Sequence, residues 1–211
     1  TLTLTLTRAA SPSCATCPNP NPNPHPNPNP SQGGITKLRY MQFRERTSTS
    51  SALGFRLEGL VVADVVPQAE GEASSEASSS QLPRVQLEVP SKEALSTIST
   101  EAGIEAQLHT FIRGDAQLKE RYLQRLREIH STLSACLPFS EHQFINSSLL
   151  FVHDAARERC GVWMIDFSKA RPAKAPLTHM TDWQLGNQED GYLFGLTNMV
   201  RIWEGISVDD V

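Results

Sequence analysis

The sequence predicts an α+β fold in which helices pack on a small antiparallel sheet. Residues 118–133 carry apolar side chains at steps of three and four, which is the period of an amphipathic helix. Residues 147–154 and 162–166 are apolar runs separated by a polar turn, the pattern of a β-hairpin. Polar residues 187–191 then precede a second amphipathic helix. Together these patterns favour helices on one face of a hairpin-based sheet.

Composition and charge narrow the class of protein. The 211 residues and 23.3 kDa give room for one substantial domain. A net charge of −4 and a pI of about 5.9 argue against a nucleic-acid binder or a polybasic membrane binder. No stretch approaches the roughly 20 apolar residues of a membrane-spanning helix. Of the four cysteines, Cys14 and Cys17 form a C-x-x-C pair while Cys136 and Cys160 stand apart, which is not a disulfide framework, so we expect a reduced, cytoplasmic protein, with a nuclear location also open.

Residues 1–36 differ in composition from the rest of the chain. Thr-Leu repeats from Thr1 to Thr7, and Asn-Pro repeats from Asn19 to Pro30. Because neither repeat can bury a core, we expect this segment to be disordered or polyproline-like. A proline-rich docking segment is the functional alternative. Since an ACCCTA repeat encodes Thr-Leu in one frame and Pro-Asn in another, mistranslated repeat DNA is a third interpretation.

Three further segments precede the helices. Residues 37–46 interleave basic and aromatic side chains, which indicates either a solvated basic element or a phosphate-binding strip. Residues 53–62 alternate as a strand, with bends expected at Gly54 and Gly59. Residues 64–91 lack aromatic side chains and are rich in Ala, Ser, Glu and Pro, which predicts a mobile surface loop.

Capping residues predict two helices. Ser91 is expected to cap a helix that runs to about Arg113, after which Gly114 breaks the chain and Asp115 caps the next helix. That next helix has one apolar stripe, and its basic residues lie mostly elsewhere. The stripe consists of Leu118, Tyr122, Leu126, Ile129 and Leu133. We expect the stripe to pack on a core, with a calmodulin-binding helix as the alternative.

The predicted hairpin ends in an acidic residue. Asp166 follows an apolar strand and precedes Phe167 and Ser168. Kinases hold the Mg²⁺ that bridges nucleotide phosphates with an acid in this position, although aspartates at strand ends are common. The following helix carries Leu193, Leu196 and Val200 on its apolar face, and we expect it to support the hairpin.

Five segments, in one order, resemble the inositol-trisphosphate 3-kinases within the wider inositol polyphosphate kinase family. They are RYMQFRE, LGFRLEG, SSLLFVHD, VWMIDFSK and GNQEDGYLFGLTNM, and the resemblance covers about residues 37–205. It implies the C-terminal lobe of a two-lobed, protein-kinase-like fold whose N-terminal lobe is missing, so that residues 37–211 form one lobe. It also implies phosphorylation of the 3-hydroxyl of inositol 1,4,5-trisphosphate with ATP and Mg²⁺, often under calmodulin regulation.

The resemblance also implies the site residues. A family stretch, KPRYMQWR, lines the inositol-phosphate site. Its counterparts here are Lys37, Arg39, Tyr40, Met41, Gln42 and Arg44. Asp166 is implied as a catalytic metal ligand, Ser148 as a neighbour of the metal and the nucleotide phosphates, and Lys169 as a catalytic contact to a substrate phosphate. Catalysis there would consist of positioning and charge neutralisation around the transferring phosphoryl group.

The chain departs from the family pattern at several positions. The PxxxDxKxG block, which carries the presumed base, is absent before residue 37, and Val61 stands where a nucleotide-contacting lysine is usual. The DFG-like glycine, the arginine of GNRED and the aspartate of GLDN are replaced. Their replacements are Ser168, Gln188 and Thr197. We therefore expect a partial kinase that is inactive alone. The alternatives are a non-catalytic inositol-phosphate-binding pseudokinase and a scaffold recruited by the proline-rich segment.

Overall fold

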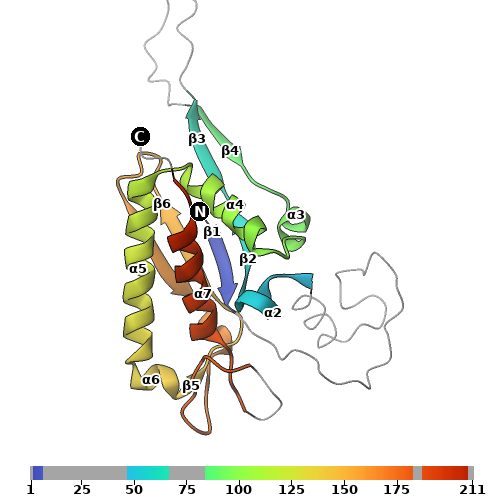
Figure 1. The fold of residues 1–211 in the computed structure, drawn as a ribbon, viewed down its shortest axis with the longest axis vertical. Helices are drawn as coiled ribbons and strands as arrows, with labels where there is room; N and C mark the ends of the chain where they lie inside the picture. The colour runs from blue at the N-terminus through green and yellow to red at the C-terminus, as the bar shows by residue number, and fades with distance from the viewer. Residues whose placement is uncertain (1, 7–46, 67–83, 183–186, 209–211) are drawn as a thin grey trace, which may run out of the picture.

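The computed structural model describes residues 2–6, 47–66, 84–182 and 187–208, and these form an α+β fold with antiparallel sheets, as predicted (Figure 1). The strands are β1 (Leu2–Leu6), β2 (Phe55–Leu60), β3 (Val62–Val66), β4 (Arg84–Glu88), β5 (His142–Gln143), β6 (Ser147–His153), β7 (Cys160–Ile165) and β8 (Arg171–Pro172). The helices are α2 (Ser50–Leu53), α3 (Lys92–Ser96), α4 (Glu101–Ile112), α5 (Ala116–Ser134), α6 (Leu137–Ser140) and α7 (Tyr192–Gly205), with a 3₁₀ turn, η1, at Phe167–Lys169.

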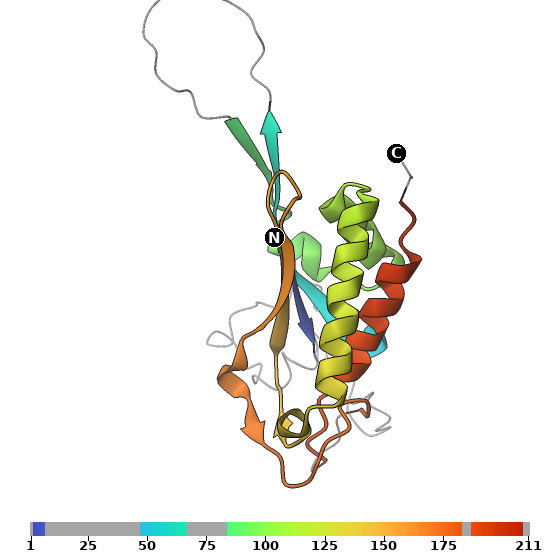
Figure 2. The same ribbon diagram turned by 90° about the vertical axis from the view of Figure 1, so that its left-hand side faces the viewer.

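The main sheet has the strand order β2-β1-β6-β7, and its helices lie on one side (Figure 2). In that view α5 (yellow-green) and α7 (red) run side by side along the same face. The predicted α5 stripe lies in the core, where Leu118, Tyr122, Leu126 and Ile129 are buried. Burying one such side chain stabilises the fold by roughly 1.5–3 kcal/mol. The stripe therefore packs on the core, the first of the two interpretations of this helix.

Residues 2–6 correct the expectation that all of 1–36 is disordered. They form β1, which pairs antiparallel with β2 from Leu2↔Leu60 to Leu6↔Phe55 and with β6 from Leu2↔Phe151 to Leu6↔Ser147. A Thr-Leu repeat has the two-residue period of a strand and includes β-branched residues, and two neighbouring strands supply hydrogen-bond partners for its backbone. The proline repeat and the rest of 7–36 lie outside the described residues.

The structure also shortens the loop expected at 64–91. Residues 62–66 and 84–88 pair as the antiparallel strands β3 and β4, from Val62↔Glu88 to Val66↔Arg84. The Val-rich and alternating sequences at the two ends of this segment favour strands. The prediction of a loop came from the average composition of the whole segment, which is dominated by its Ala- and Ser-rich centre. Residues 67–83 lie outside the described residues.

The helix expected from Ser91 to Arg113 is two helices, α3 and α4. Ser91 and Thr100 each accept a hydrogen bond from the backbone amide three residues ahead, so each starts a helix of its own. The sequence from Ser96 to Thr100 consists only of Ser, Thr and Ile, which are weaker helix formers than Ala or Leu. The predicted break is confirmed, since Gly114 has a left-handed backbone and Asp115 caps α5 through the Leu118 amide at 2.8 Å.

The β6–β7 hairpin is present as predicted, with a shorter turn. Cys160 and Gly161 were expected in the turn but begin β7, and Cys160 pairs with His153. Among the described residues, no helix has both the length and the apolar content to span a bilayer.

Candidate functional site

The end of the β6–β7 hairpin brings Ser148 and Asp166 together. Ser148 of β6 pairs with Ile165 of β7, the residue directly before Asp166. The hydroxyl of Ser147 donates to the backbone carbonyl of Asp166 at 3.4 Å. Asp166 has a left-handed backbone, with φ of 66°, which turns the chain out of the strand. Ser148 is buried and Asp166 is exposed, so the carboxylate stands at the open end of a fixed hairpin.

Lys169 lies one turn after Asp166. It is the last residue of η1, and the Ala170 amide closes this turn on the Phe167 carbonyl at 2.9 Å. Both charged side chains are exposed. The structure therefore places the three described site residues, Ser148, Asp166 and Lys169, at one end of the main sheet, with the Asp166 carboxylate and the Lys169 ammonium group exposed and Ser148 buried.

The oxygen groups at this end fit a divalent cation that is shared with phosphates. Mg²⁺ is usually held by one or two carboxylates together with substrate phosphates and water. Asp166 supplies one exposed carboxylate and leaves other coordination positions open. No group of three or more His, Cys, Asp or Glu side chains placed to enclose a metal occurs in the described part of the chain. One exposed carboxylate with open surroundings is the donor set that a cation shared with phosphates would need here.

The face of β6 and β7 opposite the helices is apolar. Leu149, Phe151 and Val162 point into the helix-covered core, so the alternate residues of the two strands lie on the other face. On that face Leu150 pairs with Trp163, which is 50% exposed, and Ser148 pairs with Ile165. An apolar strip thus leads along the sheet to the Ser148–Asp166 end.

The expected inositol-phosphate strip lies outside the described residues. It comprises Lys37, Arg39, Tyr40, Met41, Gln42 and Arg44. Its contact with the hairpin end stays a prediction.

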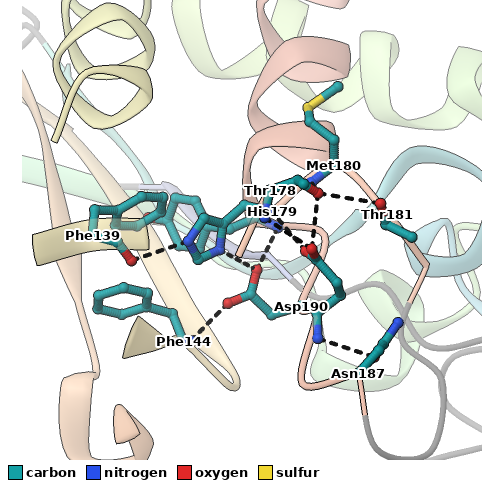
Figure 3. Close-up of polar contacts among 10 residues, drawn as sticks. Phe139, Phe144, Thr178, His179, Met180, Thr181, Asn187 and Asp190 are labelled. Atoms are coloured by element: carbon teal, nitrogen blue, oxygen red, sulfur yellow. Dashed lines mark hydrogen bonds and ion pairs between the residues drawn. The ribbon is translucent and has the colours of Figure 1, made fainter. Parts of the chain in front are cut away.

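A buried polar network beside this site escaped the sequence analysis (Figure 3). The imidazole of His179 lies between the Asp190 carboxylate, with Nδ1 2.8 Å from Oδ1, and the Phe139 carbonyl, with Nε2 3.1 Å from the oxygen. Asp190 also accepts the Tyr192 amide at 3.0 Å, so the polar run at 187–191 caps α7 as expected. Burial raises the pKa of the Tyr192 hydroxyl. The sequence does show two adjacent acids before an apolar helix, which hints at a polar network. It does not show which distant residues these acids contact.

Two departures from the family pattern make contacts of their own. The side-chain oxygen of Gln188 accepts the Lys174 backbone amide at 2.9 Å, a bond that an arginine cannot make because guanidinium has no acceptor. The hydroxyl of Thr197 donates to the Leu193 carbonyl at 2.8 Å and lies 3.0 Å from Nε2 of His130. Gln188 and Thr197 therefore each have a packing role in this chain.

Comparison with known proteins identifies the family. The inositol polyphosphate kinase family profile matches residues 12–204. Inositol-trisphosphate 3-kinase A of Rattus norvegicus is 40% identical over 174 residues, which cover 82% of this chain and 32% of that protein. Inositol-trisphosphate 3-kinase C of Mus musculus is 37% identical over 179 residues, which cover 84% of this chain and 23% of that protein. The chain thus spans a third or less of the length of these relatives.

Solved structures agree on the fold. An inositol phosphate multikinase has a TM-score of 0.60 at 15% identity, covering 98% of this chain and 78% of its own. The multikinase of S. cerevisiae, solved with ADP and Mn²⁺, has a TM-score of 0.60 at 18% identity, covering 96% of this chain and 76% of its own. The family profile, the curated relatives and the fold together confirm the resemblance seen in the sequence. This chain belongs to the inositol polyphosphate kinase family.

Proposed function

We propose that this protein takes part in ATP-dependent phosphorylation of inositol 1,4,5-trisphosphate at the 3-hydroxyl. The observation that carries the proposal is the meeting of Ser148, Asp166 and Lys169 at the end of the β6–β7 hairpin. Relatives named inositol-trisphosphate 3-kinases, 34–40% identical over most of this chain, support the choice of substrate.

The hairpin end would hold a divalent cation, and we propose Mg²⁺. Asp166 supplies the carboxylate, and Ser148 on the neighbouring strand lies beside it. A bound cation would neutralise charge on the nucleotide phosphates. Lys169, one turn away, has the length and charge to contact a phosphate of the inositol. These side chains would orient the phosphates and offset the charge that spreads over the phosphoryl oxygens during transfer.

The apolar face of β6 and β7 supports the choice of a nucleotide as donor. The partly exposed Leu150 and Ile165 and the exposed Trp163 form an apolar strip that ends at Asp166. A nucleoside on this surface would place its phosphates at the carboxylate. The basic strip at 37–46 is proposed to bind the phosphates of the inositol, because a triply phosphorylated sugar needs several cations.

The test measures turnover and binding on the full chain. Product formed from inositol 1,4,5-trisphosphate, ATP and Mg²⁺ is followed by anion-exchange chromatography, and ligand binding by calorimetry. We expect Asp166→Asn to weaken binding of Mn²⁺·ADP while binding of the inositol phosphate is retained, and to abolish any transfer that the wild-type chain catalyses. Mn²⁺·ADP affinity that is unchanged in Asp166→Asn would contradict the metal assignment.

A non-catalytic inositol-phosphate binder is the second candidate function. The observation that favours it is that Ser168 and Thr197 stand at positions where the family pattern has Gly and Asp. Binding of inositol 1,4,5-trisphosphate without binding of Mn²⁺·ADP would select this candidate. Binding of both ligands, with transfer, would select the kinase.

A further inference from the structure

The His179–Asp190 pair is too deeply buried to touch a substrate. His179 is 1% exposed and Asp190 is 6% exposed. The Phe139 carbonyl can only accept, so Nε2 of His179 donates to it, and Nδ1 on the other side of the ring lies 2.8 Å from Asp190 Oδ1. The Phe139 ring also packs on the imidazole at 4.1 Å between centroids. The pair therefore fixes the Asp190 carboxylate rigidly inside the fold.

The second oxygen of Asp190 holds the segment that leads into β6. Oδ2 accepts the Phe144 backbone amide at 2.7 Å, and Phe144 lies three residues before the start of β6. Residue Asn146, between them, has a left-handed backbone with φ of 56°, so this connection is a tight turn. Fixing the Phe144 amide thereby fixes where Ser147 and Ser148 enter the sheet.

Two contacts continue from this segment to Asp166. The Phe144 ring meets the Phe167 ring edge-on, with centroids 6.1 Å apart, and Phe167 directly follows Asp166. In addition, the Ser147 hydroxyl donates to the Asp166 carbonyl. The Asp190 carboxylate is thus linked to both strands of the hairpin end.

We propose that Asp190, held by His179, is a positioning residue that sets the place of Asp166 and Ser148 at the hairpin end. This inference rests on the proposed function for its meaning in phosphoryl transfer. Residues that orient a metal ligand from behind typically change metal affinity about 10–100-fold when they are removed. Asp190 acts here through Phe144 rather than by contact with a ligand.

The neighbouring acid provides a matched control. Glu189 is also buried and also accepts three hydrogen bonds, from the amide and hydroxyl of Thr178 and from the amide of His179. These bonds stay within the loop that precedes α7 and do not reach Phe144. Asp190→Asn and Glu189→Gln therefore remove the same kind of group from adjacent positions with different connections.

The experiment compares these variants of the full chain in two measurements. Binding of Mn²⁺·ADP is followed by electron paramagnetic resonance, and the amide signals of Asp166 and Phe167 are followed by NMR in metal-free protein. We expect Asp190→Asn to weaken Mn²⁺·ADP binding about tenfold and to shift both amide signals. We expect Glu189→Gln to lower the melting temperature similarly, to keep Mn²⁺·ADP affinity within about twofold of wild type, and to leave both signals in place.

Equal effects of the two substitutions, or unmoved amide signals in Asp190→Asn, would overturn the inference. If wild-type protein fails to bind Mn²⁺·ADP, the proposed function fails, but the metal-free amide comparison still decides the inference. Phe144→Leu keeps the amide bond to Asp190 and removes the ring contact to Phe167, so it serves if Asp190→Asn does not fold. An unmoved Phe167 signal in that variant would also overturn the inference.

Discussion

A Cβ atom on Gly54 would lie 2.9 Å from the Cα of Gly195, so α2 and α7 approach each other through two glycines. Gly54 also has a left-handed backbone, with φ of 76°. The side chain of Asn198 donates to the Leu53 carbonyl at 3.1 Å and holds the same contact. This close approach fixes the start of β2 against the helix layer.

Gly54→Ala should destabilise the fold by at least about 2 kcal/mol, because the left-handed backbone alone costs roughly 1–2 kcal/mol and the added methyl group meets backbone atoms. Urea unfolding followed by circular dichroism measures the change. Gly205→Ala is the control, since a Cβ there meets nothing within 4 Å in the last turn of α7. It should be neutral or stabilise by about 0.5–1 kcal/mol. Equal losses in the two variants would refute the packing argument.

Leu4→Pro should prevent cooperative folding. β1 is paired on both sides, so a proline at its centre removes a hydrogen bond to one neighbour and distorts pairing with the other. Loss of a sharp thermal transition in circular dichroism is the expected result. Leu4→Val keeps the amide and should retain the transition. A folded Leu4→Pro variant of wild-type stability would show that β1 is dispensable.

Lys169→Ala should weaken inositol 1,4,5-trisphosphate binding about tenfold or more, because a charged hydrogen bond to a phosphate contributes about 1.5–3 kcal/mol. Calorimetry on the full chain measures the dissociation constant. Lys174→Ala removes an equal charge from another exposed position and should change affinity by less than about twofold. If both substitutions weaken binding equally, the assignment of Lys169 is wrong, because the loss would then reflect the net charge of the protein rather than a direct contact.

Stability should fall as the pH is lowered from about 6.5 to about 4, in part because of His153. Burial lowers the pKa of His153 to about 4, and the charge of Arg157 acts in the same direction. Because the pKa of His153 is lower in the folded state than in the unfolded chain, protons bind the unfolded chain first as the pH falls. The stability that the neutral ring contributes is therefore fully present above the unfolded pKa and is lost as the pH drops toward the folded pKa.

Urea midpoints measured from pH 7 to pH 4 test this prediction, and His153→Gln should flatten the slope. Tyr122→Phe removes the hydroxyl that lies 3.0 Å from His153 Nδ1 but keeps the titrating ring, so it should lower stability while it retains a pH slope. An unchanged slope in His153→Gln would assign the effect to other groups.

Local patterns predicted the parts of the fold that each segment specifies by itself. The α5 stripe and the Asp115 cap follow from helical period and from hydrogen bonds three residues apart, and both are present. The predicted polar start of α7 is present as well, where the Asp190 carboxylate accepts the Tyr192 amide two residues ahead. The β6–β7 hairpin was also predicted, because two apolar runs joined by a short polar turn have few ways to pair, whereas the place of Ser148 beside Asp166 was implied only by the family resemblance.

Contacts between distant segments were not predictable. The Asp190–Phe144 bond joins residues that lie 46 positions apart, and no periodicity encodes it. Likewise, the Thr-Leu segment at 2–6 forms a strand because β2 and β6 flank it. The composition of the segment alone does not reveal these partners. Contacts with distant segments therefore determine both the Asp190–Phe144 bond and strand β1, and local propensity is compatible with each.

The repeat in β1 has a consequence for alignment. A strand whose side chains alternate strictly is usually locked in place, because a shift by one residue turns its apolar face outward. In Thr1–Thr7, however, a shift by two residues replaces every residue with one of the same type. Side-chain type within the repeat therefore does not distinguish registers that differ by two residues. The observed alignment of β1 rests on its backbone pairs with β2 and β6.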